Sequence, residues 1–252
     1  MNPPGSFDGK VAIVTGAAQG IGEAYATALA QRGVSVIVAD INVDLAASVA
    51  EKIVADGGVA KAVRVDVSDV ESTKAMAAFT KEELGGIDLL VNNAAIYGDM
   101  EFNSLTNVDW DYYKRFMSVN MDGVLLCTRA CVGSMRKRGG GAIVNQSSTA
   151  AWLYAAFYGL AKVGVNGLTQ QLAHELGGQG IRVNAIAPGP IDTEATRRTA
   201  GDLINPIVES LAIKRVGTPD DLVGMCLFLL SDEARWVTGQ IINVDGGQVF
   251  RS

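Results

Sequence analysis

The chain has 252 residues, of which 48% are hydrophobic and 19% charged, and 29 are glycine. A chain of this length and composition can bury a large core with many tight turns, which excludes disordered and fibrous classes. The formal net charge of −6 argues against a nucleic-acid partner, because binding to phosphates depends on clustered Lys and Arg.

Strands and helices are expected to alternate along the chain. Short apolar runs rich in Val and Ile predict strands at 10–16, 34–40, 60–67, 87–95, 141–148, 181–189 and 239–247. Helical periodicity predicts helices at 21–33, 43–55, 70–84, 109–139, 158–176 and 219–232. Continuous apolar strands alternating with helices are typical of a parallel sheet covered on both faces. We therefore expect one doubly wound, Rossmann-like α/β domain over 1–252, with about seven strands.

Two segments fall outside this alternation. Residues 1–9 read as an N-terminal tail. Residues 190–219 form an irregular region that is too long for a simple connection, and such regions often cover a binding site. We expect this second region to act as a substrate lid.

A glycine-rich turn follows the first predicted strand. The sequence TGAAQGIG places Gly16, Gly20 and Gly22 around Gln19 and Ile21, directly before the first helix. Glycines at these positions permit a sharp turn and let backbone amides approach a pyrophosphate at the helix N-terminus. The alternative is a glycine turn that only saves space. Because it lies between a strand and a helix, the turn predicts a dinucleotide site.

Polar residues end the next strands. Asp40 ends the second strand, where a carboxylate can accept hydrogen bonds from a ribose and repel a 2′-phosphate. No Arg or Lys lies in the glycine turn, so the sequence favours NAD over NADP; capping of the following helix is the alternative role of Asp40. Asp66 with Val67, and Asn92 with Asn93, end two further strands, which predicts one crevice along the carboxyl edge of the sheet.

Tyr158 and Lys162 stand four residues apart in YGLAK, so on a helix they share one face. A nearby ammonium favours the phenolate and would lower the tyrosine pKa, which suits acid–base chemistry. The alternative is a tyrosine packed on the core and a lysine that extends to water.

Several motifs in order resemble those of the short-chain dehydrogenase/reductase family. TGAAQGIG resembles its TGxxxGxG turn, NNAA its NNAG, YGLAK its YxxxK and NAIAPGPIDT its NxxxPGxIxT, and DGG closes the core. The resemblance covers nearly the whole chain and points to an NAD-dependent member, similar to 3-oxoacyl carrier-protein reductases. Two departures stand out: Ala95 replaces the last glycine of NNAG, and the segment from Ser148 to Tyr158 is shorter than usual for the family.

The resemblance also implies catalytic roles. Tyr158 would be the acid or base, and Lys162 would hold the nicotinamide ribose and lower the pKa of the tyrosine. Ser148 would hydrogen-bond the substrate oxygen, with Ser147 as the alternative. Asn120 would support a water relay to the lysine.

By the same resemblance, other residues would contact the cofactor. Asp66 and Val67 would meet adenine, and Asn93 and Ala94 the adenosine ribose. The full set of expected cofactor contacts is Gly16, Gln19, Gly20, Ile21, Gly22, Asp40, Asp66, Val67, Asn93, Ala94, Tyr158, Lys162, Pro188, Gly189, Ile191 and Thr193.

The expected function is hydride transfer between NAD(H) and a hydrophobic secondary alcohol or ketone. Aromatic and apolar residues around the predicted site favour a hydrophobic substrate, although they could equally belong to the core or to subunit contacts: Tyr97, Met100, Trp152, Leu153, Tyr154 and Phe157. The alternatives are a 3-oxoacyl-thioester reductase and, from a different class, a non-catalytic dinucleotide sensor. Family resemblance further implies a homotetramer.

The remaining composition sets expectations about location and metals. Three cysteines and one histidine favour a reduced, cytoplasmic protein without a metal site. His174 reads as a solvated helix residue rather than a catalytic base. The first ten residues lack the apolar segment of a signal peptide, and no apolar run approaches membrane-spanning length, so no membrane partner is expected.

Overall fold

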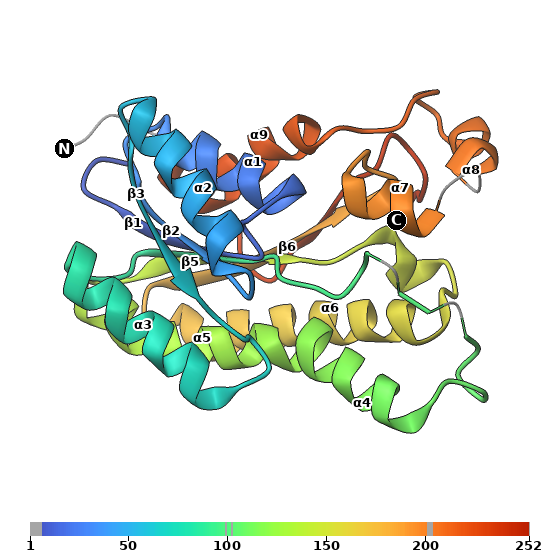
Figure 1. The fold of residues 1–252 in the computed structure, drawn as a ribbon, viewed down its shortest axis with the longest axis horizontal. Helices are drawn as coiled ribbons and strands as arrows, with labels where there is room; N and C mark the ends of the chain where they lie inside the picture. Colours follow the sequence, from blue (N-terminus) through green and yellow to red (C-terminus); the bar gives the residue numbers. More distant parts are fainter. Residues whose placement is uncertain (1–6, 99, 102, 201–203, 252) are drawn as a thin grey trace.

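The computed structural model describes residues 7–98, 100, 101, 103–200 and 204–251. Seven parallel strands form one sheet in the order β3-β2-β1-β4-β5-β6-β7 (Figure 1). Their bounds are β1 Val11–Thr15, β2 Ser35–Asp40, β3 Val59–Arg64, β4 Leu89–Asn92, β5 Gly141–Gln146, β6 Ile181–Pro188 and β7 Ile241–Val244. The expected doubly wound α/β fold is confirmed.

The helices connect these strands. Six of them correspond to the predicted helices: α1 Gly20–Ala30, α2 Val43–Ala55, α3 Val70–Leu84, α5 Gly123–Lys137, α6 Ala156–Gly177 and α9 Pro219–Leu230. The predicted helix at 109–139 also contains α4 Trp110–Met117, and the structure adds α7 Glu194–Ala200 and α8 Ile204–Ser210. Among the described residues, no helix combines the length and apolarity needed to cross a bilayer.

Each face of the sheet carries its own hydrophobic core. Ala12 and Val14 of β1 pack in a cluster with α1, α2 and α9, whereas Ile13 packs in a second cluster with α3, α5 and α6. This division follows from the strand geometry, because successive side chains point to opposite faces. Figure 1 shows the same two helix layers, above and below the sheet.

The predicted long helix at 109–139 is interrupted. A π-helical turn, Ser118–Asp122, separates α4 from α5, and it contains the buried Asn120. The Asn120 side chain accepts a hydrogen bond from the Ile96 amide (2.9 Å) and donates to the Ile96 carbonyl (3.2 Å). Such a turn is common at functional sites, and here it joins the helix to the loop after β4.

The two irregular segments differ in part from their prediction. Phe7 is 4% exposed and belongs to the core, so the end of the expected tail at 1–9 is packed; residues 1–6 lie outside the described residues. The expected lid at 190–219 contains two short helices, α7 and α8, with residues 201–203 outside the described part.

Strand order places the site. β1 lies between β2 and β4. After β3 the chain therefore returns to the centre of the sheet, and the later strands are added on the other side of β1. Ligands of open parallel sheets bind at such a reversal, beyond the carboxyl ends of the strands. The predicted polar strand ends therefore lie along one edge of the sheet.

Candidate active site

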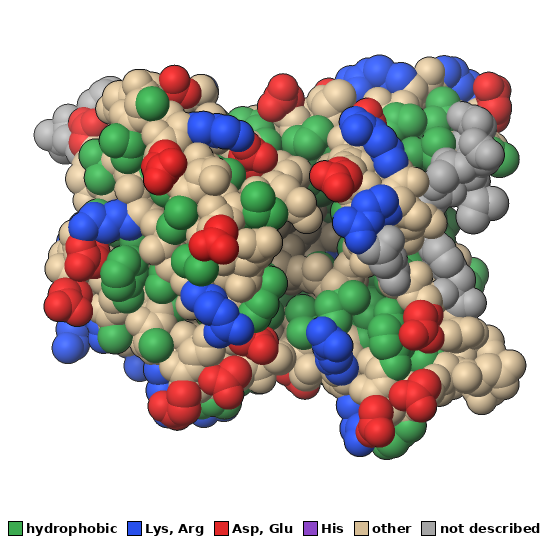
Figure 2. All heavy atoms as spheres, viewed as in Figure 1, with side chains coloured by type: hydrophobic (Ala, Val, Ile, Leu, Met, Phe, Trp, Pro, Cys, Tyr) green, Lys and Arg blue, Asp and Glu red, His purple; other side chains and the backbone are tan. Residues whose placement is uncertain are grey.

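A cavity of about 690 Å³ lies along this edge. Its mouth is the recess near the centre of the face in Figure 2, where acidic and basic side chains are interspersed. All the predicted catalytic and cofactor residues line it except Gly22 and Asn120. The structure thus brings together side chains from seven parts of the chain: 16–21, 40, 66–67, 93–94, 148, 158–162 and 188–193.

The glycine turn is closely packed. A Cβ on Gly22 would lie 2.2 Å from the Gly16 carbonyl oxygen, and one on Gly16 would lie 2.7 Å from the Ala94 Cα. Gly16 and Gly20 also have positive φ angles of 63° and 60°. Side chains at these positions would displace backbone, so glycine is required for the turn itself. Gly22 therefore shapes the site from outside the cavity.

The first turn of α1 faces the cavity. Its N-cap residue, Gln19, is extended and makes no side-chain capping hydrogen bond. The first amides of the helix consequently have no side-chain acceptor, and the helix dipole favours an anion there. This arrangement, together with the crowded glycine turn, fits the pyrophosphate of a dinucleotide.

Thr15 organises the turn, and the sequence analysis did not select it. Its hydroxyl donates to the Val91 carbonyl (3.3 Å) and accepts from the amides of Asn93 (3.0 Å) and Ala94 (3.1 Å). Asn93 in turn donates its side-chain amide to the carbonyls of Thr15 (3.1 Å) and Gly16 (3.0 Å). Thr15 thus ties the end of β1 to the end of β4; its place in the TGxxxGxG motif was the available signal.

Asp40 lies at the expected ribose end of the cavity. Its carboxylate accepts from the Ala18 amide (3.1 Å) and the Asn42 amide (2.9 Å). The N-cap of α2 is Asn42, whose side chain accepts from the Leu45 amide. The alternative role of Asp40 as the helix cap is therefore wrong, and its carboxylate lines the cavity.

Asp66 and Val67 form the next part of the wall. The Asp66 carboxylate accepts from the Ser68 hydroxyl (2.6 Å) and amide (3.0 Å). These hydrogen bonds hold the pKa of Asp66 below its ordinary value. Val67 is 5% exposed, so an ionised carboxylate and an apolar surface lie side by side at the expected adenine end.

Tyr158 lies between two aromatic rings. Its ring centroid is 5.5 Å from that of Tyr97 and 6.3 Å from that of Phe116. Burial raises its pKa well above the ordinary value, while the neighbouring Ser148 hydroxyl acts in the opposite direction. The expected lowering of the tyrosine pKa by Lys162 is not seen, because the cost of burying a phenolate is the larger effect.

Lys162 is 4% exposed and does not extend to water. Its ammonium donates to the Gln146 carbonyl (2.8 Å) and lies 5.8 Å from the centroid of the Tyr158 ring. Burial lowers the pKa of Lys162 to about 8. The alternative in which the lysine extends to water is therefore wrong. Tyr158 packs against the buried Phe116 and Phe157 and also lines the cavity.

The two serines differ in their partners. The Ser147 hydroxyl donates to the Asn166 side chain at 2.6 Å, which ties β5 to α6. Ser148 instead lies beside Tyr158, and its hydroxyl oxygen accepts from the Ala150 amide (3.1 Å). Ser148 is therefore better placed to meet a substrate oxygen.

The apolar wall differs from the sequence expectation. Tyr97, Met100 and Leu153 line the cavity, as do Ile204 and Ile207 of α8. Phe157 instead belongs to the core (2% exposed) and Tyr154 is fully exposed. Trp152 packs under the Arg251 guanidinium, 4.0 Å from its ring centroid. The polar lining residues that the sequence analysis missed include Gln146, Thr196, Thr199 and Gln248, because no local motif marks them.

The cysteines and the histidine do not line the cavity. The three cysteines are buried, and burial raises their pKa values. His174 is exposed on α6. Within the described residues, no group of His, Cys, Asp and Glu could hold a metal ion.

A parallel doubly wound sheet with a glycine turn before its first helix and a Tyr–Lys pair in the crevice defines a nucleotide-binding oxidoreductase. A family model described as enoyl-(acyl carrier protein) reductase matches residues 16–248. The chain belongs to the short-chain dehydrogenase/reductase family.

Relatives agree with this assignment. An uncharacterized oxidoreductase of Mycobacterium tuberculosis is 70% identical over 247 residues, covering 98% of this chain and 100% of the relative. The structure of a 7α-hydroxysteroid dehydrogenase complexed with NADH and 7-oxo glycochenodeoxycholic acid has a TM-score of 0.91 and 35% identity, covering 100% of this chain and 99% of its own. A structure from Beutenbergia cavernae with bound NADP has a TM-score of 0.90 and 34% identity, covering 98% and 99%.

Proposed function

We propose that the protein transfers a hydride between NAD(H) and a hydrophobic secondary alcohol or ketone. The observation that carries the proposal is the convergence of Tyr158 and Ser148 in a cavity with an apolar wall. Their hydroxyls lie where one substrate oxygen could reach both. The steroid dehydrogenase with its bound 7-oxo bile acid supports a hydrophobic ketone as substrate class.

The residues of the chain would handle the proton and the substrate oxygen. The nicotinamide, when bound, supplies or accepts the hydride. During alcohol oxidation, Tyr158 takes the hydroxyl proton while Ser148 stabilises the charge that develops on oxygen. The Lys162 ammonium, held on the Gln146 carbonyl, favours the phenolate when it is charged. Reduction reverses these steps.

Asn120 is proposed to act as a support. Its side chain hydrogen-bonds Ile96 through both polar atoms and so holds the loop after β4 against the π-helical turn. A second N–H and a second oxygen lone pair remain on this amide, and we propose that they serve the water relay to Lys162.

The remaining cofactor contacts follow from position. We propose that Asp40 binds the adenosine ribose and selects NAD, because its carboxylate would repel a 2′-phosphate. The first turn of α1 would hold the pyrophosphate, Asp66 and Val67 the adenine, and Asn93 with Ala94 the adjoining ribose. The nicotinamide end would lie at Pro188, Gly189, Ile191 and Thr193, which all line the cavity.

Replacement of Tyr158 by Phe tests the proposal. We expect turnover to fall by about 1,000-fold or more, as for loss of a general acid–base, while NADH binding measured by fluorescence persists. A suitable panel contains cyclohexanol, 2-octanol, a 7α-hydroxysteroid and the corresponding ketones, with NADPH as the comparison cofactor. Undiminished turnover by this variant would contradict the mechanism.

Two alternatives remain distinguishable. A 3-oxoacyl-thioester reductase is supported by the carrier-protein description of the matching family model, and it predicts faster reduction of acetoacetyl-CoA than of simple ketones. A non-catalytic sensor predicts NADH binding without turnover of any panel member.

We also propose a cytoplasmic homotetramer. Leu160 and Val163 of α6 are 42% and 48% exposed, which leaves apolar surface on that helix for a partner subunit. Light scattering coupled to size-exclusion chromatography would give the subunit number, and a monomer at micromolar concentration would contradict the proposal.

A further inference from the structure

Tyr97 forms one side of the slot that holds Tyr158. The two rings are tilted by 43° with centroids 5.5 Å apart. Phe116, whose ring centroid lies 6.3 Å from that of Tyr158, is fully buried and packs edge-on against Phe157 with centroids 4.8 Å apart. Phe116 is therefore fixed by the core, whereas Tyr97 lies on the cavity wall. The orientation of Tyr158 depends on both neighbours.

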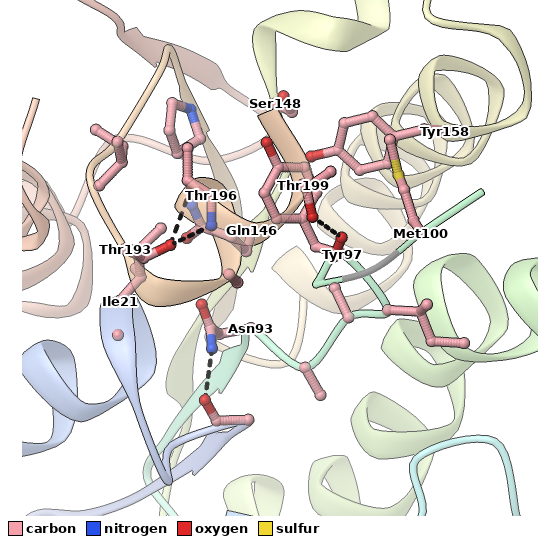
Figure 3. Close-up of a pocket in the computed structure, with 18 of the residues that line it drawn as sticks. Ile21, Asn93, Tyr97, Met100, Gln146, Ser148, Tyr158, Thr193, Thr196 and Thr199 are labelled. Atoms are coloured by element: carbon pink, nitrogen blue, oxygen red, sulfur yellow. Dashed lines mark hydrogen bonds between the residues drawn. The ribbon is translucent and has the colours of Figure 1, made fainter. Parts of the chain in front are cut away.

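Tyr97 is also attached to α7. The Thr199 hydroxyl donates to the Tyr97 carbonyl at 2.7 Å, and the Thr196 side chain lies beside the Tyr97 hydroxyl, whose pKa it acts to lower. Figure 3 shows Tyr97 beside Tyr158, with the Thr199 hydrogen bond drawn. The following residue, Gly98, approaches α7 so closely that a Cβ there would lie 3.6 Å from the Ala195 Cβ. Backbone, hydroxyl and packing contacts thus all join the 97–98 segment to this helix.

The link continues to the expected nicotinamide end. The Thr196 amide donates to the Thr193 hydroxyl oxygen at 3.1 Å, and the two threonine hydroxyls lie 3.0 Å apart. Residues of α7 and of the segment before it form a wall of the cavity. A continuous set of contacts therefore runs from Thr193 through Thr196 and Tyr97 to the Tyr158 ring.

We propose that Tyr97 is a positioning residue that couples α7, a wall of the substrate cavity, to the orientation of Tyr158. Its ring sets the angle of the Tyr158 ring, and its hydroxyl and carbonyl hold α7 in place. Substrate contacts on α7 are thereby transmitted to the proton-transferring group. The kinetic part of this proposal rests on the proposed dehydrogenase function; the structural link between Tyr97 and α7 does not.

The ring and the hydroxyl of Tyr97 have separate roles, so different variants separate them. Tyr97→Phe keeps the ring against Tyr158 and removes the hydroxyl beside Thr196, so we expect KM for the best alcohol of the panel to rise about fivefold with kcat little changed. Tyr97→Leu removes the ring, so we expect kcat to fall about 100-fold, because misorientation of a reacting group is costly. Tyr154→Phe, in a fully exposed tyrosine of the same cavity region, is the matched control and should leave both constants unchanged.

Hydrogen exchange measures the link without any turnover. In the cofactor-free protein, Tyr97→Phe and Thr199→Val should each speed amide exchange in residues 194–200 by about fivefold, with exchange in α6 unchanged. Thr199→Val removes the hydrogen bond to the Tyr97 carbonyl, and Tyr97→Phe removes the hydroxyl beside Thr196. In the double variant, the factor by which exchange in residues 194–200 is accelerated should be smaller than the product of the two single factors, because both substitutions act through Tyr97.

The outcomes separate the two proposals. Unchanged exchange in 194–200 for both variants would overturn the coupling, as would wild-type kcat and KM in Tyr97→Leu. A loss of NADH affinity in Tyr97→Leu as large as its loss of kcat would also overturn it, because the change would then be a general disruption. If the wild-type protein oxidised no alcohol of the panel, the proposed function would fail, and the exchange rates alone would decide the coupling.

Discussion

The Lys162 ammonium donates a hydrogen bond to the main-chain carbonyl of Gln146, 2.8 Å away, at the end of β5. This bond places the charge below the Tyr158 ring, 5.8 Å from its centroid. The end of β5 therefore fixes the position of the Lys162 ammonium, which the helix α6 brings close to Tyr158. The same strand continues into Ser147 and Ser148, so β5 positions three of the groups in the candidate active site.

Stability should depend on pH through Lys162. Its folded pKa of about 8 lies below the ordinary value, so between these two pKa values the unfolded chain binds a proton that the folded protein does not. The folded state is then penalised at low pH, and stability rises as pH increases through this window. Compared with Lys162→Met, the wild-type protein should gain about 2–3 kcal/mol of unfolding free energy between about pH 7 and pH 10.

Urea unfolding of both cofactor-free proteins across this pH range provides the measurement. When the unfolding free energy of one protein is subtracted from that of the other at each pH, the contributions of titratable groups that both proteins share cancel, including those of the buried tyrosines. A constant difference across the range would show that Lys162 keeps its ordinary pKa.

The two serines should separate into different roles. Ser148→Ala removes the hydroxyl beside Tyr158, and we expect kcat to fall about 100- to 1,000-fold, as for the loss of one oxyanion donor. Ser147→Ala removes the bond to Asn166 and should lower the unfolding free energy by about 1 kcal/mol with kcat changed only a few-fold. Steady-state kinetics and thermal unfolding of both variants would measure this, and the reverse pattern would assign the substrate oxygen to Ser147.

Asp40 should control the choice of cofactor. Replacement by Ala removes the charge that would repel a 2′-phosphate, so the ratio of kcat/KM for NADPH to that for NADH should rise about 100-fold. Glu51→Gln, on the exposed surface of α2, changes charge equally and is the control. A wild-type preference for NADPH would refute the proposed role of Asp40.

Gly22 should tolerate no side chain. Gly22→Ala would place its Cβ 2.2 Å from the Gly16 carbonyl oxygen and 2.6 Å from the Asn93 side chain, so the turn must distort. We expect a loss of about 1–3 kcal/mol in stability and a large loss of NADH affinity. Gly133→Ala, in α5 with nothing within 4 Å of its Cβ, is the control and should be neutral or stabilising. Equal NADH binding by both variants would argue against a closely packed cofactor turn.

The local sequence was sufficient to predict the fold. The apolar runs of β1 and β2 and the helical period of α2 depend on neighbours a few residues away, and these predicted elements are confirmed within a few residues. The glycine turn and YGLAK were likewise readable, because each encodes its geometry in a short spacing. The position of Asp40 at the carboxyl edge of the sheet was also predictable, because Asp40 is the last residue of the predicted second strand.

Longer-range contacts decided the rest. Tyr97 meets Thr199 across 102 positions of the chain, and Lys162 meets a main-chain carbonyl whose identity no spacing reveals. The pKa values of Tyr158 and Lys162 moved in the direction of burial, which depends on packing by residues from several elements.

The sequence by itself determined the alternation of strands and helices, the family and the residues able to transfer a proton, because these depend on composition and short spacing. Only the tertiary structure decided which serine lies beside Tyr158, that Asn42 rather than Asp40 caps α2, and that Tyr97 contacts both α7 and Tyr158. Each of these depends on which distant groups compete for one hydrogen bond or one packing position, and that competition is settled only when the chain is folded.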